Sequence, residues 1–126
     1  MKSNYCINNL LKFISVLQDN SIDIFSNTTS YNNLSLGSSV FCKCYNTRVI
    51  TLYTKNGELF TSNFSHNGIL KNSYYFRVLS VNDNCCTLLI LDYNNGSFTS
   101  TKQSVVVNTS CIAAVKCIED VNIVLL

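Results

Sequence analysis

The sequence predicts a mainly β protein, an antiparallel β-sandwich or barrel with one N-terminal helix. Short runs of β-branched, aromatic and aliphatic residues follow Val40, and polar turns interrupt them about every 8 to 12 residues. Asn-Gly, the strongest short hairpin signal, occurs at residues 56–57, 67–68 and 95–96. Only the N-terminal region has a helical period. The 126 residues fit one domain, residues 1–126.

Residues 4–18 are expected to form the helix. Apolar side chains recur there at spacings of three and four, which places them on one side of a helix; they are Cys6, Leu10, Phe13, Ile14 and Leu17. Residues 19–39 are rich in Ser and Asn and are expected to form a polar loop. Residues 40–126 then form the β domain.

The β domain is organised around a hairpin from Tyr75 to Tyr93. Two apolar runs flank a polar break at residues 82–84, as in two strands joined by a short loop. The second strand opens with Cys85 and Cys86, and neighbours in a strand point to opposite faces. We expect Cys86 to face inward and Cys85 to be the more exposed thiol, although the sequence does not fix the register.

The other strands are expected on either side of this hairpin. A β-branched run precedes Asn56-Gly57, and a second run follows it, so these two are expected to pair. The expected strands are Thr47–Thr54, Glu58–Phe64, Phe98–Asn108, Cys111–Ile118 and Val121–Leu126.

Composition excludes several classes of protein. Hydrophobic residues make up 47% of the chain and charged residues 13%, which excludes a solvated disordered chain. The net charge of +2 and the scattered cations do not favour nucleic acid as a partner. No stretch approaches the roughly 20 apolar residues of a membrane span. Polar residues interrupt the apolar run at 7–17, so we expect no signal peptide and synthesis in a cytoplasm.

The seven cysteines are an odd number, so at least one has no partner within the chain. Cys42 and Cys44 share a face of any strand they occupy, with parallel side chains that suit a mutual disulfide poorly. Cys111 and Cys117 would lie roughly 20 Å apart on a continuous strand. Each needs a partner on another strand or another chain. All seven are cross-linking candidates: Cys6, Cys42, Cys44, Cys85, Cys86, Cys111 and Cys117.

Little in the sequence indicates catalysis or a metal site. The cysteine spacings lack the paired C-x2-C pattern of structural zinc sites, and His66 is the sole histidine. No glycine-rich phosphate loop is present. We therefore expect no enzyme activity, catalytic residue, metal, cofactor or small-molecule substrate. A small cytoplasmic metal- or thiol-binding module is the alternative from another class.

Four blocks of the chain are distinctive: residues 5–14 (YCINNLLKFI), 46–57 (NTRVITLYTKNG), 75–81 (YFRVLSV, with Cys86 beyond) and 110–118 (SCIAAVKCI). Together, and in this order, they resemble the CotY/CotZ/ExsY family of cysteine-rich spore coat and exosporium proteins. The last block is the most specific. Cys6, Cys86, Cys111 and Cys117 match family cysteines, and Cys85 matches in some members. Ser104 and Ala113 stand where related chains have cysteine.

The resemblance implies a structural subunit that self-assembles into a two-dimensional, hexagonal-type lattice reinforced by intermolecular disulfides. Its partners would be copies of itself and other spore coat or exosporium proteins. It would be made in the mother-cell cytoplasm without a signal peptide and would meet an oxidising exterior when that cell lyses. A spore-surface fibre built from such subunits is a further alternative.

Overall fold

The computed structural model describes residues 5–26 and 45–125. In chain order these residues form helix α1, strands β1 to β6, a short 3-10 helix η4 and strand β7. Cys42, Cys44 and residues 27–39 of the expected loop lie outside the described residues.

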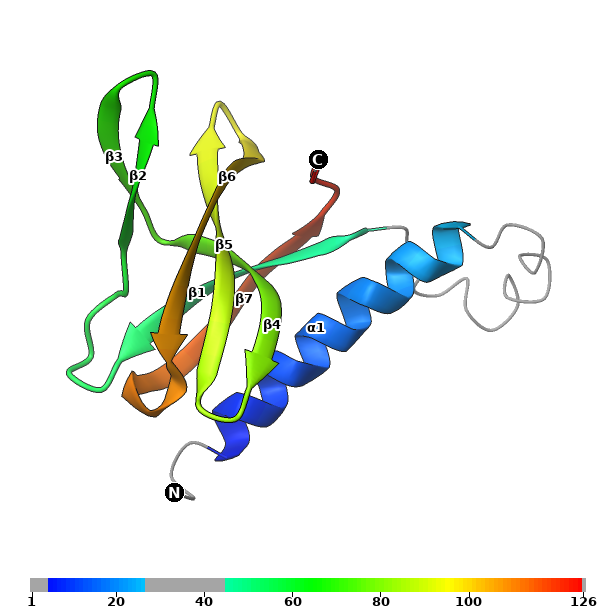
Figure 1. The fold of residues 1–126 in the computed structure, drawn as a ribbon, viewed down its shortest axis with the longest axis vertical. Helices are drawn as coiled ribbons and strands as arrows, with labels where there is room; N and C mark the ends of the chain where they lie inside the picture. The colour runs from blue at the N-terminus through cyan, green and yellow to red at the C-terminus, as the bar shows by residue number, and fades with distance from the viewer. Residues whose placement is uncertain (1–4, 27–44, 126) are drawn as a thin grey trace.

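Five antiparallel strands make the larger sheet, in the order β6-β5-β4-β1-β7 (Figure 1). The expected central hairpin is confirmed, because β4 and β5 pair along their length across a turn at Asp83 and Asn84. The strand bounds are Thr47–Thr54 for β1, Tyr75–Asn82 for β4, Cys85–Asn94 for β5, Ser97–Asn108 for β6 and Ile112–Val121 for β7. β6 and β7 are the two edges of this sheet.

A second, two-stranded sheet projects from the first as an arm (Figure 1). It consists of β2 (Ser62–His66) and β3 (Ile69–Ser73). Phe64, in the middle of β2, is buried. The Gln103 side chain of β6 donates to the Ser65 carbonyl and accepts from the Ser65 N–H. A lone two-stranded hairpin is marginally stable in water. These contacts to β6 therefore help to stabilise the arm.

Two of the three expected Asn-Gly turns form hairpins as predicted. Residues 67–68 join β2 to β3 and residues 95–96 join β5 to β6, with positive φ at both turn residues in each case. The Asn56-Gly57 turn leads only to a bridge between Tyr53 and Leu59. Since β4 and β7 already pair with the two edges of β1, the chain after this turn cannot extend as a further neighbour.

Helix α1 runs from Tyr5 to Ser26, beyond the expected end at residue 18. Residues 19–26 are therefore helical, and their assignment to the polar loop is wrong. No Gly or Pro interrupts these residues, and Ile22 continues the four-residue spacing of Ile14 and Gln18. The buried Gln18 side chain donates to the Val78 carbonyl (2.9 Å), which fixes the helix to the sheet past Leu17.

The larger sheet carries a hydrophobic core on each face. Ile50 and Leu52 of β1 point to the side of α1, where Leu11, Ile14 and Phe64 complete the first core. The second core lies on the opposite face, where Val49, Leu89, Leu91, Phe98 and Ile123 pack together. The mainly β, antiparallel fold with one N-terminal helix is confirmed. The arrangement is sandwich-like and the larger sheet does not close into a barrel.

The expected last strand, Val121–Leu126, does not form within the described residues, because the chain leaves the sheet after Val121 and residues 122–125 are not in a strand. The Asn46 side chain accepts from the Ile123 N–H and donates to the Ile123 carbonyl, so it satisfies backbone groups that a strand partner would otherwise satisfy. Ile123 is then free to pack on the second core. Among the described residues, no helix has the length and apolar content of a membrane span.

Candidate functional site

The described cysteines divide into one buried and four exposed thiols, and all five are free. Cys86 is the buried thiol. The exposed thiols are Cys6, Cys85, Cys111 and Cys117.

Cys85 and Cys86 open β5 and face opposite ways, as alternation along a strand requires. Cys86 pairs with Val81 and Val107 in the ladder and is part of the first core, with no exposed surface. Burial raises the pKa of the Cys86 thiol to about 11. Since the thiolate is the reactive form, Cys86 is an inert apolar side chain at neutral pH.

Three of the exposed thiols belong to one end of the molecule. Cys6 lies in the first turn of α1, and Cys85 follows the β4–β5 turn. Asn8 of the same helix end donates to the Asp83 carbonyl in that turn (2.8 Å). The Thr109 N–H of η4 donates to the Asn84 carbonyl (2.8 Å), which brings the Cys111 segment to the same turn. The start of α1, the β4–β5 turn and the connection from β6 to β7 lie together at one end of the molecule (Figure 1). This end, named here the thiol end, carries Cys6, Cys85 and Cys111.

Cys111 lies in η4 (Thr109–Cys111) and not in the strand that the sequence predicts. The Asn108 side chain accepts from the Ser110 N–H (3.0 Å) and so stabilises the 3-10 turn before the strand begins. The Cys111 carbonyl accepts from the Lys55 N–H (3.2 Å). Cys111 and Cys117 are consequently presented by different elements, one at the thiol end and one on β7.

Cys117 lies on β7, opposite Ile50 of β1. Arg48 and Asp120 lie on the same face as Cys117, and the Arg48 guanidinium donates to both carboxylate oxygens of Asp120 (2.8 and 2.9 Å). The pKa of Arg48 is raised, first by its hydrogen bond to Asp120 and then, against some desolvation, by the Asp120 charge and by Cys117. The Cys117 thiol is therefore next to a fixed cation.

The sequence analysis did not identify the contact of Cys117 with Arg48 and Asp120. Arg48 and Asp120 are 72 residues apart in the chain, and no local pattern joins them. Only the antiparallel register of β1 and β7 shows that they are opposite each other.

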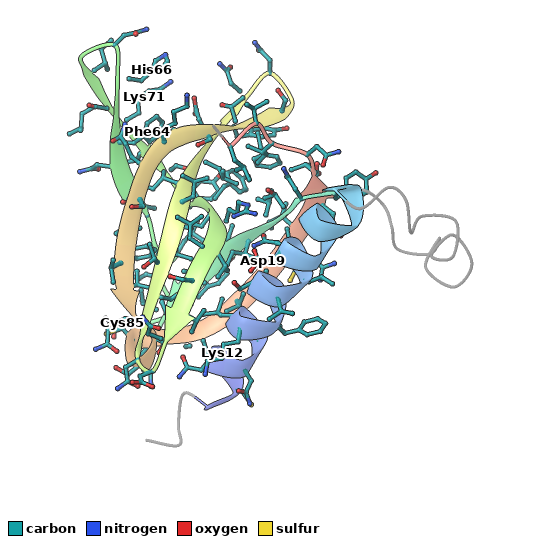
Figure 2. All side chains as sticks on the ribbon, turned by 45° about the vertical axis from the view of Figure 1, so that its right-hand side comes forward. Lys12, Asp19, Phe64, His66, Lys71 and Cys85 are labelled. Carbon is teal, nitrogen blue, oxygen red and sulfur yellow. The ribbon has the colours of Figure 1, made fainter. Side chains whose placement is uncertain are left out.

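The thiols do not gather into a metal site within the described residues, where no group of three or more His, Cys, Asp and Glu side chains is placed to hold an ion. His66 lies on the β2–β3 arm, at the opposite end of the molecule from Cys85 (Figure 2). The described residues thus present exposed thiols in two regions of the surface, the thiol end and β7, an arrangement that suits bonds to other molecules.

A family model described as "Spore coat protein Z" matches residues 1–97 of the chain. The match covers α1 and the strands from β1 to β5, and so includes the Cys85-Cys86 pair and most of the thiol end. No curated protein and no solved structure gave a significant match.

Proposed function

The chain belongs to the spore coat protein Z family, and we propose that it self-assembles into a coat or exosporium layer reinforced by intermolecular disulfides. The family assignment supports a structural role in the spore coat. One observation carries the finer proposal: the described part of the chain exposes four free thiols on two separate regions of its surface.

The separation of the thiols is what favours an extended assembly. A subunit with one reactive surface forms a closed pair, whereas contacts at two or more different surfaces propagate into rings, sheets or fibres. The thiol end supplies one such surface and Cys117 on β7 supplies another. We infer a hexagonal-type lattice, as the family resemblance implies, with copies of the chain and other coat proteins as partners.

The low charge of the surface favours close approach of copies. Like-charged proteins repel each other, and this chain has a formal net charge of only +2. Large apolar side chains are also exposed at several places, including Phe13 and Val16 on α1 and Ile69 and Leu70 on the arm. Exposed apolar side chains that cluster are typical of interaction surfaces.

Oxidation would follow assembly in this proposal. Thiols are kept reduced in a cytoplasm, so subunits made in the mother cell would first associate without covalent bonds. Disulfides would form when lysis exposes the layer to an oxidising exterior. The buried, protonated Cys86 would take no part in them.

The test compares the wild-type chain with two variants under reducing and oxidising conditions. In the first variant Cys6, Cys85, Cys111 and Cys117 are replaced by Ser; in the control, Cys86 alone is replaced by Ala. Wild type is expected to form covalent oligomers on non-reducing gels that reductant dissolves. The fourfold variant should lose most of them, and Cys86→Ala should retain them if it folds.

Electron microscopy of negatively stained assemblies then separates sheets from fibres. A wild-type chain that stays monomeric under oxidising conditions at high concentration would contradict the proposal.

A further inference from the structure

The outer edge of β7 has no neighbouring strand among the described residues. β7 is ten residues long and ends the sheet order. Seven of its residues are exposed, and they include apolar side chains such as Ile118. A long edge strand of this kind presents unpaired N–H and C=O groups that can pair with another strand.

The other edge of the sheet, β6, is protected in two ways. Lys102 has φ +65°, and the register with β5 shifts between Leu89 and Leu91, so β6 bends in its middle. The arm also lies along it, through the two hydrogen bonds of Gln103 to Ser65. Bulges and covering segments are the devices by which proteins prevent pairing at sheet edges. β7 also has two register shifts with β1, at Ile118 and Ala113, but among the described residues no strand pairs with its outer side.

We propose that β7 pairs antiparallel with β7 of a second copy about a twofold axis, with Cys117 of the two copies opposite each other. This inference rests on the proposed self-assembly and names one of its interfaces. The family match ends at residue 97, so β7 lies beyond it and the inference depends on the structure alone.

Charge complementarity selects this register. Ile118 has no partner on β1, because Cys117 pairs with Ile50 and Glu119 pairs with Val49. Ile118 is therefore a bulge residue and takes no position in the register. Glu119 then lies one register position after Cys117, and Lys116 lies one position before it. With Cys117 on the axis, Lys116 is therefore opposite the partner's Glu119, and the symmetry repeats the pair.

The two charges also point to the same side of the sheet. Lys116 pairs with Thr51 and Glu119 with Val49, which are two residues apart on β1 and share a face. Directly opposite residues of an antiparallel pair must share a face, and opposite charges there stabilise the pair. Two Lys–Glu pairs thus stabilise the register that places the two Cys117 thiols together.

The same register permits a disulfide on the axis. Opposite Cα atoms of antiparallel strands are about 4.5 or 5.5 Å apart, within the range of about 4.4 to 6.8 Å that disulfides span. With oxidised glutathione as the oxidant, one Cys117 thiolate attacks the glutathione disulfide and releases one glutathione thiolate. The second Cys117 thiolate attacks the mixed disulfide and releases the other. Two electrons pass from the Cys117 sulfurs to glutathione, and their two protons complete its thiols.

The noncovalent part is tested with the full chain in reductant, by sedimentation analysis of Lys116→Glu, Glu119→Lys and the double charge swap. Each single variant places like charges opposite each other twice and should weaken self-association by about tenfold or more. The double swap restores opposite charges and should return association to within about threefold of wild type. Equal association of all four chains would overturn the interface.

The covalent part uses chains that keep Cys86 and one other cysteine, either Cys117 or Cys85, with the remaining cysteines replaced by Ser. Oxidised glutathione should convert the Cys117 chain to a dimer whose Cys117–Cys117 peptide is identified by mass spectrometry, and should do so faster than for the Cys85 chain. Equal rates would overturn the register.

The failures are distinguishable. If wild type assembles while the charge variants match it, the β7 interface is wrong and the proposed function stands. If wild type does not associate at all, both fail.

Discussion

Cys85 and Cys86 are adjacent in β5, yet one thiol is exposed and the other is completely buried. Their reactivities should differ accordingly. Iodoacetamide at neutral pH is expected to modify Cys85 in the native protein and to leave Cys86 intact, because only the thiolate reacts and Cys86 is both inaccessible and protonated. Peptide mass spectrometry of Cys85→Ser and Cys86→Ala chains measures each thiol by itself. In denaturant both should react; similar native rates would contradict the placement of Cys86.

The raised pKa of Cys86 also makes stability depend on pH. The thiol ordinarily has a pKa near 9.0, and burial raises it to about 11. Above pH 9 the unfolded chain loses this proton while the folded chain keeps it, so stability is complete below pH 9 and falls as pH rises toward 11. We expect the free energy of unfolding of wild type to fall by about 1 kcal/mol more than that of Cys86→Ala between pH 8 and pH 10.

Urea denaturation of both chains at the two pH values measures this difference. Tyr and Lys titrate in both chains and cancel in the comparison. Parallel pH profiles for the two chains would show that Cys86 is solvated in the folded state.

The sequence predicted the parts of the fold that local patterns determine. Alternation predicted the β4–β5 hairpin and the opposite faces of Cys85 and Cys86, and the positive φ of Asn-Gly predicted the turns at residues 67–68 and 95–96. The predicted end of α1 at residue 18 was wrong because a polar residue, Gln18, lies on the buried face of the helix. The hydrogen-bond partners of its side chain lie far away in the sequence. A local period cannot detect such partners.

The sequence predicted which cysteines are candidates for cross-linking, but it did not predict which of them lie together on the surface. That Cys6, Cys85 and Cys111 share one end depends on hydrogen bonds between Asn8 and Asp83 and between Thr109 and Asn84. The contact of Arg48 with Cys117 depends on the order β4-β1-β7, in which β1 pairs with strands far along the chain. Sheet order of this kind depends on long-range packing, which a single sequence does not display.

Gln18 is predicted to be the most important polar side chain of α1. Its amide donates to the Val78 carbonyl (2.9 Å) and accepts from the Arg48 N–H (2.9 Å), so one side chain joins the helix to β4 and β1. Gln18→Ala would leave both backbone groups without this partner and should lower the free energy of unfolding by about 2–4 kcal/mol. Lys12→Ala, at an exposed position of the same helix, is the control and should change it by less than about 0.5 kcal/mol. Similar losses in thermal or urea denaturation of both variants would contradict this role.

Gly96 is predicted to be required by backbone conformation and not by packing. Its φ is +84°, and a Cβ built there would meet no atom within 4 Å. Gly96→Ala should therefore lower the free energy of unfolding by about 1–2 kcal/mol, the cost of a left-handed conformation for a residue with a side chain. Asn95→Gly is the matched control, since its φ of +52° suits glycine and the loss should be smaller. Equal stability of wild type and Gly96→Ala in urea would show that the turn changes conformation.

The Arg48–Asp120 ion pair is predicted to contribute little to stability despite its two hydrogen bonds. Its side chains are 31% and 38% exposed, so water and salt screen the interaction. Asp120→Asn should lower the free energy of unfolding by only about 0.2–1 kcal/mol, and the difference should shrink in 1 M salt. Lys71 and Asp92 form a looser surface pair, with 4.0 Å between the Lys71 Nζ and Asp92 Oδ2 atoms. Asp92→Asn is the comparison and should lower the free energy of unfolding by still less. A salt-independent loss well above 1 kcal/mol for Asp120→Asn would mean that Asp120 holds β7 against β1 by more than its charge.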